Sequence, residues 1–355
     1  MTARRAFVIG RHEHRHPHFL VNGALLQSID HRLPIASLRP PAKLNLFLEL
    51  LARRDDGFHE IDTVMVPIDW CDRIRVRRTE LPGVQLKVDW LPSTATAARR
   101  LDASSAQLDV PCDDTNLVHR ALTRFAEAFG VAGGFECDLL KSIPAGAGMG
   151  GASSDAAAAL RCAAELCGVA NHHSEIAVIA AELGSDVPFF LGDGGRRISA
   201  ARARGRGEKL TPVTLASPLH GVVVFPNESL STARVYAASN VPAEPLSAEG
   251  LIEALRGGIL KNIEVQLMNR LSQPAREIAP RIDEILKSMW RAGLRTCQLT
   301  GSGSACFALA NSARDARMAS ARLRAVLEPG AFVVATRAAG VPPNIEVTPS
   351  DAELG

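Results

Sequence analysis

The sequence predicts an α+β fold in two domains with a ligand cleft between them. The chain has 355 residues, whereas a single hydrophobic core rarely grows past roughly 250 residues. The first half carries strand-like runs with a two-residue period, and the second half alternates such runs with helix-like segments. We therefore expect domains at 36–205 and 206–340, preceded by a flexible extension over 1–35 and followed by a polar tail over 341–355.

Strands dominate the first hundred residues. Leucines between Leu44 and Leu50 alternate with Asn45, Phe47 and Glu49, which indicates a strand with one buried face. Further strands are predicted at 61–70, 73–78 and 84–90, together forming an antiparallel sheet. The mixture of Pro, Ser, Thr and Ala from 91 to about 112 has no clean period, so a surface insertion is expected there.

Helices and strands then follow one another. A helix should begin at Asp114 or Thr115, whose side chains can cap it, and end at Gly130. A strand at 135–141, a loop at 144–154 and a small-residue helix at 156–167 come next. In the second half, strands are predicted at 221–225, 295–299, 305–309 and 332–336, and helices near 247–257, 274–292 and 312–326.

Composition excludes several classes of protein. Hydrophobic residues make up 46% and charged residues 22%, which is normal for a globular chain. Lys and Arg number 40 against 38 Asp and Glu, so no whole-protein field favours a nucleic-acid or membrane partner. No apolar run is as long as the roughly 18 residues that a membrane-spanning helix needs. The seven cysteines form no CxxC pair, which favours reduced thiols in a cytoplasmic protein.

A histidine-rich run, residues 12–18, lies in the expected N-terminal extension. Such a run could bind a metal ion, but it is more typical of a flexible segment upstream of the folded domain. We therefore leave it out of the fold.

The strongest functional signal is a glycine-rich segment that leads into a helix, which we call the phosphate loop. Its residues are Pro144, Ala145, Gly146, Ala147, Gly148, Met149, Gly150, Gly151, Ala152, Ser153 and Ser154. Glycines let the backbone approach a ligand, and a helix N-terminus adds partial positive charge, so the segment predicts a phosphate site. It lacks the Lys-Ser/Thr of a Walker loop and the acidic residue of a dinucleotide fold. The alternative is a plain turn with Ser153 or Ser154 as helix cap.

Two further segments turn this loop into a family resemblance. Pro41-Ala42-Lys43-Leu44-Asn45-Leu46 and Leu299-Thr300-Gly301-Ser302-Gly303-Ser304-Ala305-Cys306, with the phosphate loop between them, resemble the three motifs of the GHMP kinases. The segments 54–59, 114–118, 183–190 and 205–208 are similar to the family of 4-diphosphocytidyl-2-C-methyl-D-erythritol kinases within that superfamily. The resemblance covers roughly 40–338.

The resemblance implies both a fold and a reaction. The fold is a ribosomal-protein-S5-like α/β domain followed by a ferredoxin-like α/β sandwich, with the active site in the cleft between them. The reaction is ATP-dependent phosphorylation of the 2-hydroxyl of a cytidine diphosphate derivative, in the non-mevalonate isoprenoid pathway. We expect a monomer or weak homodimer, although the residues themselves do not fix the oligomeric state.

Catalytic and nucleotide-binding roles are carried over from the family's motifs. Asp186 would be the general base for the substrate hydroxyl, and Lys43 would keep it ionised and offset charge on the transferring phosphoryl group. The phosphate loop would bind ATP, with Ser154 as the candidate Mg²⁺ ligand and Asp155 as a weaker one. Asn116 and Lys141 align with positions that approach the adenine.

The substrate site follows from the same likeness. A cytosine ring offers a face for stacking and an edge for hydrogen bonds. Phe58 and Tyr236 align with two clamping rings and His59 with the hydrogen-bonding reader; Phe58 replaces the tyrosine common in the family. The remaining predicted substrate-binding residues are Asn45, Gly301, Ser302 and Gly303, of which the glycine segment would approach the diphosphate.

Simpler readings exist for most of these residues. Asp186 could cap a helix, Lys43 could be an edge-strand surface charge, and Lys141 could be a strand-end charge. Asn116 could be a first-turn polar residue, Phe58 and Tyr236 core aromatics, His59 a strand cap, and the segment 301–304 a tight connection between strands. Two other functions also compete: a GHMP kinase for homoserine, mevalonate or a sugar, and an inactive ATP-binding sensor, against which the presence of both Lys43 and Asp186 argues.

Overall fold

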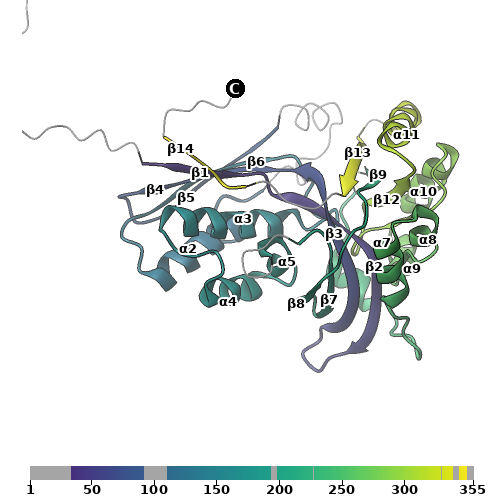
Figure 1. Cartoon of the computed structure of the whole chain (residues 1–355), viewed down its shortest axis with the longest axis horizontal. Coiled ribbons are helices and arrows are strands. Elements are labelled where there is room, and N and C mark those ends of the chain that lie inside the picture. The colour runs from purple at the N-terminus through teal and green to yellow at the C-terminus, as the bar shows by residue number, and fades with distance from the viewer. Residues whose placement is uncertain are drawn as a thin grey trace, which may run out of the picture. The chain divides into compact units, whose positions relative to one another are not determined.

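Three β-sheets and their covering helices make up the described part of the chain (Figure 1). The computed structural model describes residues 33–91, 110–192, 198–226, 228–328, 330–338 and 344–349. The histidine-rich run, most of the expected extension, insertion and tail lie outside these residues. Among the described residues, no helix has the length and apolar character needed to cross a membrane.

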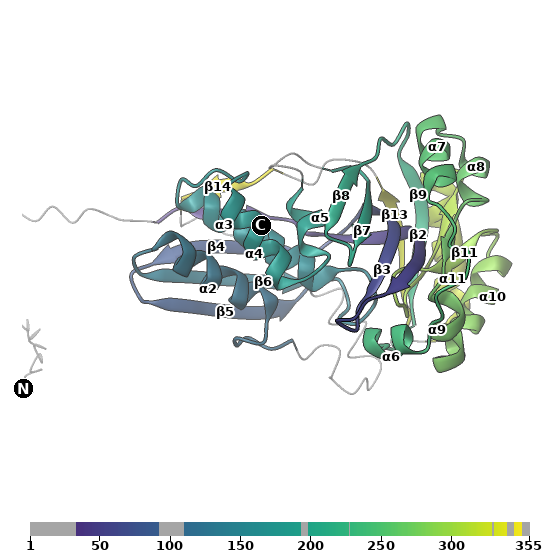
Figure 2. The same cartoon turned by 90° about the horizontal axis from the view of Figure 1, so that it is seen from below.

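The first sheet has the strand order β14-β1-β4-β6-β5. Its strands are β1 (Ile35–Leu38), β4 (Arg73–Thr79), β5 (Gly83–Trp90), β6 (Gly134–Lys141) and β14 (Glu346–Thr348). Helices α2 (Leu117–Phe129), α3 (Gly151–Leu166), α4 (Ser174–Leu183) and α5 (Val187–Leu191) belong to the same half. Figure 2 shows α2, α3 and α4 over one face of this sheet, where their apolar side chains form a common core with it.

The second sheet, in the order β10-β2-β3-β7-β8, corrects one prediction. Its strands are β2 (Pro41–Arg53), β3 (His59–Cys71), β7 (Ala201–Gly205), β8 (Lys209–Pro212) and β10 (Met268–Asn269). The prediction that β2 has one buried face is wrong, because Asn45, Phe47 and Glu49 are as buried as the leucines between them. β2 crosses from one core to the next, with irregular pairing to β3 between Asn45 and Phe47.

The third sheet, in the order β11-β12-β9-β13, belongs to the second half of the chain. Its strands are β9 (Leu219–Phe225), β11 (Cys297–Leu299), β12 (Cys306–Ala310) and β13 (Phe332–Ala338). The helices of this half are α6 (Thr232–Ala237), α7 (Glu249–Gly257), α8 (Leu260–Glu264), α9 (Ser272–Ile278), α10 (Arg281–Arg291) and α11 (Ala313–Val326). Alternate residues of β9 and β12 face the α9–α11 layer on one side and the second sheet on the other.

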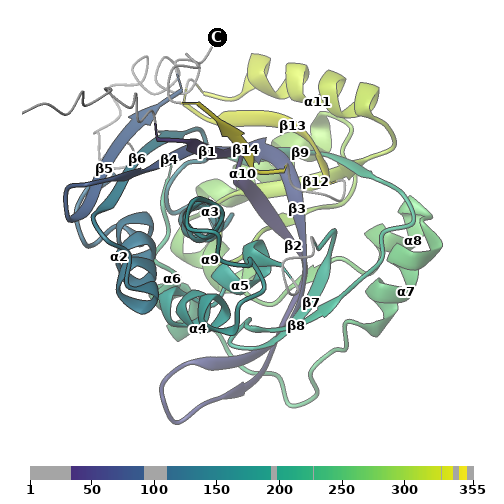
Figure 3. The ribbon, with the colours of Figure 1, turned by 60° about the vertical axis from the view of Figure 1, so that its left-hand side comes forward.

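The two halves share a hydrophobic core instead of packing as separate bodies. Side chains from β2 and β3 pack with those of β9, β12 and α7 in one cluster, and β10 pairs with β2 in parallel. Figure 1 shows β2 and β3 between α2–α5 on one side and α7–α11 on the other, and Figure 3 shows the two strands running side by side into their hairpin. The predicted boundary between 205 and 206 falls in the turn of the β7–β8 hairpin, and the domain limits stay a prediction.

Several other elements differ from their predictions. The first strands lie in two sheets, and β5 runs parallel to β6, so the prediction of one antiparallel sheet is wrong. The helix predicted at 274–292 is two helices, because α9 ends before Pro280 and residues preceding a proline disfavour the helical region. Ile35 and 346–348 belong to the first sheet although they lie in the expected extension and tail. The strands predicted at 61–70, 135–141 and 221–225 are confirmed.

Candidate active site

The phosphate loop leads from β6 into α3 and is attached to the core by two of its side chains. Ala147 and Met149 point into the shared core, where both are almost fully buried. Gly148 has φ +74°, and a Cβ there would lie 2.5 Å from the Thr300 carbonyl oxygen, so only glycine fits. The neighbouring glycines of the loop have no side chain, so their backbone groups line the cleft.

The start of α3 decides between the two readings of this loop. The N-cap is Gly150, with φ +69° and no side-chain capping bond. Ser153 and Ser154 lie inside the first turn of the helix, so the alternative in which one of them caps it is wrong. The N–H groups at this helix start have no side-chain cap, which is the arrangement expected of an anion site.

Main-chain hydrogen bonds join all three motifs of the resemblance. Lys43 N donates to Met149 O at 2.9 Å, and Ala305 N donates to Ala147 O at 3.2 Å. Asn45, two residues after Lys43 in the first motif, adds a further bond, since its backbone N donates to Thr300 Oγ1 at 3.0 Å. The phosphate loop is therefore held between β2 and the third motif, residues 299–306.

A cleft of about 790 Å³ opens beside this junction. It is lined by residues 144–153 together with Lys43, Asn45, Phe58, His59, Asn116, Lys141, Asp155, Asp186, Tyr236, Gly301 and Ser302. Of the predicted site residues, only Ser154 and Gly303 do not line it. Residues that the sequence places more than 250 positions apart are therefore brought to one cavity.

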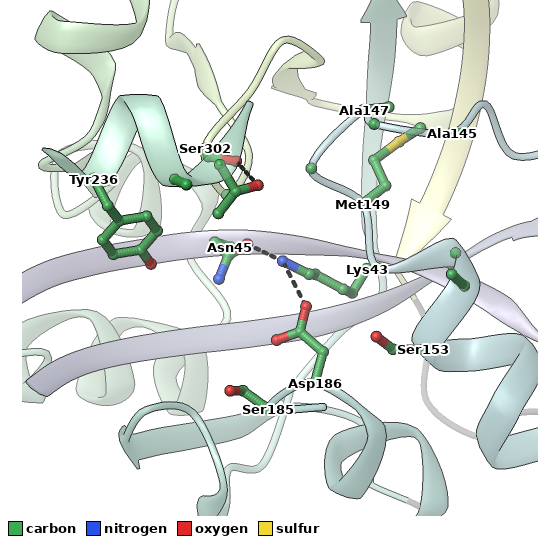
Figure 4. A pocket seen from close by; sticks show the side chains of 18 of the residues that line it. Lys43, Asn45, Ala145, Ala147, Met149, Ser153, Ser185, Asp186, Tyr236 and Ser302 are labelled. Atoms are coloured by element: carbon green, nitrogen blue, oxygen red, sulfur yellow. Dashed lines mark hydrogen bonds and ion pairs between the residues drawn. The ribbon is translucent and has the colours of Figure 1, made fainter. Parts of the chain in front are cut away.

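Lys43 and Asp186 face each other in the cleft (Figure 4). Lys43 Nζ lies 3.4 Å from Asp186 Oδ2 and donates to Asn45 Oδ1 at 2.6 Å. Asn45 Nδ2 in turn donates to Thr63 Oγ1 at 2.9 Å. Asn45 thus orients the lysine. It also lines the cleft, and the substrate contact predicted for it stays a prediction.

The simpler readings of Lys43 and Asp186 are both wrong. Lys43 is 4% exposed and lies on an inner strand of the second sheet, so it is not an edge-strand surface charge. Asp186 occupies the N-cap position of α5, but its side chain makes no capping hydrogen bond. Its carboxylate points instead toward Lys43 (Figure 4).

Lys141 is the centre of a second charged group, which we call the anchor triad: Asp72, Lys141 and Asp155. Lys141 Nζ donates to Asp155 Oδ2 at 2.6 Å and to Asp72 Oδ2. Burial alone would lower the pKa of Lys141, but the two carboxylates raise it by more. Burial raises the pKa of Asp155 well above its ordinary value. Lys141 is therefore not a simple strand-end charge.

Asn116 has its amide engaged within the fold. It is the N-cap of α2, where its Oδ1 accepts from Val118 N at 2.8 Å and its Nδ2 donates to Pro111 O at 2.7 Å. The predicted caps Asp114 and Thr115 are therefore wrong by one or two positions. Asn116 still lines the cleft, so its predicted approach to adenine stays a prediction.

Of the predicted substrate residues, Tyr236 lies at the opposite end of the pocket from Ser153 of α3, with Lys43 and Asp186 between them (Figure 4). The rings of His59 and Tyr236 lie with centroids 5.4 Å apart. Burial, and secondarily Arg53, lowers the pKa of His59, which favours its neutral form. Burial and the charge of Asp186 raise the pKa of Tyr236. A neutral imidazole and a protonated phenol therefore line this end.

Phe58 is half-exposed and is not a core aromatic. The guanidinium of Arg206 lies 5.3 Å from its ring centroid, and both residues line the cleft. Arg206 was not given a role from the sequence, although it stands in the matching segment 205–208. Ser185, Thr232 and Arg53 also line the cleft without having been predicted; Thr232 Oγ1 lies 2.9 Å from Ser302 Oγ.

The oxygens available for Mg²⁺ are few. Among the residues that the structure describes, no three His, Cys, Asp or Glu side chains gather to form a metal site. Ser154 Oγ and Asp155 Oδ1 are buried without a hydrogen-bond partner, but only Asp155 lines the cleft. With so few protein oxygens in the cleft, a Mg²⁺ ion would be held mainly by phosphate oxygens and water. The geometry does not favour Ser154 over Asp155 as its protein ligand.

Comparisons with known proteins identify the family. The descriptions "GHMP kinases N terminal domain" and "GHMP kinases C terminal" match residues 116–194 and 251–328. The 4-diphosphocytidyl-2-C-methyl-D-erythritol kinase of Rhodopirellula baltica is 50% identical over 323 residues, covering 88% of this chain and 98% of its own. The chain therefore belongs to the 4-diphosphocytidyl-2-C-methyl-D-erythritol kinases, a family of GHMP kinases.

Solved structures agree with this membership. A crystal structure of 4-(cytidine 5'-diphospho)-2C-methyl-D-erythritol kinase is 34% identical, with a TM-score of 0.67, covering 85% of this chain and 98% of its own. The homoserine kinase of Cytophaga hutchinsonii shares the fold at 17% identity and a TM-score of 0.65, covering 92% of this chain and 100% of its own. The predicted GHMP kinase fold and ATP-binding kinase function are confirmed.

Proposed function

We propose that this chain transfers the γ-phosphoryl group of ATP to the 2-hydroxyl of 4-diphosphocytidyl-2-C-methyl-D-erythritol. The observation that carries the proposal is the Lys43–Asp186 pair, 3.4 Å apart in the wall of the cleft that the phosphate loop also lines. A partly exposed carboxylate beside a buried ammonium group is an arrangement that can accept a proton from a bound alcohol.

In the proposed reaction, the substrate hydroxyl gives its proton to the Asp186 carboxylate as its oxygen bonds to the γ-phosphorus. The bond from that phosphorus to the β–γ bridging oxygen breaks, and ADP leaves with the electron pair. Lys43, 3.4 Å from Asp186 Oδ2, offsets negative charge on the transferring group. Mg²⁺ bound with ATP would neutralise charge on the β- and γ-phosphates.

The cytidine end of the substrate would lie against His59 and Tyr236. A neutral imidazole can donate one hydrogen bond and accept another, which suits the amino and carbonyl edge of cytosine. Tyr236 offers a ring face for stacking. Phe58 offers a second ring, which the cytosine base would share with the guanidinium of Arg206. This polar and aromatic end favours a cytidine substrate over the aliphatic alcohols of other GHMP kinases.

A substrate panel tests the proposal. ADP release would be measured with ATP and Mg²⁺ and one alcohol at a time: the cytidine substrate, homoserine, mevalonate and galactose. We expect turnover with the cytidine substrate alone. Equal turnover with a cytidine-free alcohol would refute the proposed substrate, and nucleotide binding without turnover on any alcohol would favour the inactive sensor.

Two variants connect that panel to the site. Tyr236→Leu removes the ring, so the KM for the cytidine substrate should rise about tenfold, the scale of one base–aromatic stack. Tyr236→Phe keeps the ring and serves as the matched control, with little change expected. The KM for ATP should be unaffected in both. Equal effects of the two substitutions would show that stacking on the Tyr236 ring does not contribute to binding of the cytidine substrate.

A further inference from the structure

Asp72 is a buried aspartate outside the cleft that holds the chain immediately before the phosphate loop. It is fully buried and lies in the turn between β3 and β4. Its Oδ1 accepts hydrogen bonds from Ser142 N and from Ile143 N, the latter at 2.8 Å. Pro144, the first residue of the phosphate loop, follows directly. The entrance to the loop is therefore fixed by a carboxylate that does not line the cleft.

The same group holds the exit of the phosphate loop. Asp72 Oδ2 accepts from Lys141 Nζ, which also donates to Asp155 Oδ2 at 2.6 Å. Asp155 is in the first turns of α3, directly after Ser154. A Cβ on Gly151, the first residue of α3, would lie 3.6 Å from Lys141 Nζ, so the ammonium group lies under the start of this helix. The anchor triad thus connects both ends of the loop.

Burial makes this connection stiff. All three side chains are at most 5% exposed, so water does not compete effectively for the ammonium or the carboxylates. Breaking one contact of such a group leaves a buried charge without its partner, which costs more than the loss of a surface ion pair. The distance between the two ends of the phosphate loop is therefore set by charged contacts that a bound nucleotide does not need to touch.

We propose that Asp72 is a positioning residue for the nucleotide site, acting through Lys141 and the Ser142–Ile143 backbone to hold the phosphate loop in its binding conformation. The proposal rests on the proposed function only in taking ATP as the ligand of the loop. It differs from the prediction that Lys141 approaches adenine directly, because Asp72 does not line the cleft and can affect ATP only through the residues that it holds.

The variant Asp72→Asn tests the proposal, since asparagine is nearly isosteric but would leave Lys141 with one carboxylate. We expect the KM for ATP, and the Kd of a non-hydrolysable ATP analogue measured by calorimetry, to rise ~10- to 100-fold, the scale of a displacement of about 1 Å. The KM for the alcohol substrate should stay close to its wild-type value. Nucleotide affinity needs no alcohol, so a wrong substrate assignment would not disturb this result.

Asp69→Asn is the matched control. Asp69 lies three residues earlier, and its Oδ1 accepts from Arg337 N at 2.8 Å and Thr336 Oγ1 at 2.7 Å, so it anchors β13 instead of the phosphate loop. We expect this variant to keep wild-type nucleotide affinity. Asp69 is exposed whereas Asp72 is fully buried, so urea denaturation of both variants is needed as well. A rise in the analogue's Kd for Asp72→Asn that remains under conditions where the variant is fully folded reports positioning of the loop and not a loss of stability.

Asp155→Asn keeps the test decisive if Asp72→Asn does not fold. Its expected effect is the same selective rise in the analogue's Kd, because it replaces the carboxyl group to which Lys141 Nζ donates at the exit of the loop. Wild-type nucleotide affinity in every folded triad variant would overturn the proposal. So would a loss of affinity in Lys141→Met that neither aspartate variant shares, since Lys141 would then act by direct contact.

Discussion

Two lysines with the same exposure, 4% each, have opposite surroundings. Lys43 has one carboxylate partner, Asp186, whose side chain is 32% exposed, and one neutral partner, Asn45. Lys141 has two carboxylate partners, and these are 0% and 2% exposed. The burial of the lysine itself therefore does not distinguish a reactive group from an architectural one.

The difference lies in the carboxylate. A base that takes a proton from a substrate must be reachable, and Asp186 keeps about a third of its surface open to the cleft. A carboxylate that holds a loop works best when water cannot reach it, as with Asp72. Exposure of the acidic partner is thus the better guide to function at this site.

The largest expected effect comes from the open pair. Asp186→Asn keeps the shape of the side chain but cannot accept the substrate proton, so kcat should fall ~10²- to 10⁴-fold. The affinity for the ATP analogue should remain nearly unchanged, because the phosphate loop is intact. Single-turnover measurements would check the first expectation and calorimetry the second. Turnover within about tenfold of wild type would show that a group other than Asp186 accepts the proton of the substrate hydroxyl.

The next effect separates the two lysines by stability. Lys141→Met leaves two buried carboxylates without their ammonium partner, so the free energy of unfolding should fall by ~3–5 kcal/mol. Lys43→Met should cost less, since water can solvate the partly open Asp186, even though this variant loses activity. Urea denaturation of both variants makes the comparison. Equal losses would show that exposure of the carboxylate does not separate the pairs.

The smallest effect concerns the phosphate loop. Gly148→Ala would place a Cβ 2.5 Å from Thr300 O at φ +74°, so the loop must shift and kcat/KM should fall ~10²-fold. Gly168→Ala is the control: its φ is +66°, but no atom lies within 4 Å of its Cβ. It should lose only ~1–2 kcal/mol of stability and keep its activity. Similar kinetics for both would indicate that the loop tolerates displacement.

Local rules predicted most strands and helices, but they failed where distant segments meet. The alternation in β2 predicted one buried face, yet Glu49 is buried because Arg270, more than 200 residues later, donates to its carboxylate at 2.6 Å. Residues 346–348 read as a polar tail, because pairing with β1 cannot be inferred from three residues. In each case a tertiary partner outweighed the local pattern.

The site was predictable where its residues stand in motifs. Lys43, Asp186 and the phosphate loop were all placed in the cleft as the resemblance implied. Asp72 was missed because a single aspartate at a strand end carries no signal until its partners, some 70 residues away in the sequence, are known. The bonds that Asn45 and Asn116 make to the protein could not be predicted either, because only the fold reveals them; both residues also line the cleft, and their predicted ligand contacts stay predictions.

Strand β14 is the outermost strand of the first sheet and covers the edge of β1. It pairs with Ile35, Ala36 and Ser37 of β1, whose other side already pairs with β4. A version of the chain that stops before Glu346 would leave that row of amide and carbonyl groups open to any passing strand. Self-association of such a shortened protein would result from the exposed edge of β1 and would leave the residues of the cleft unchanged.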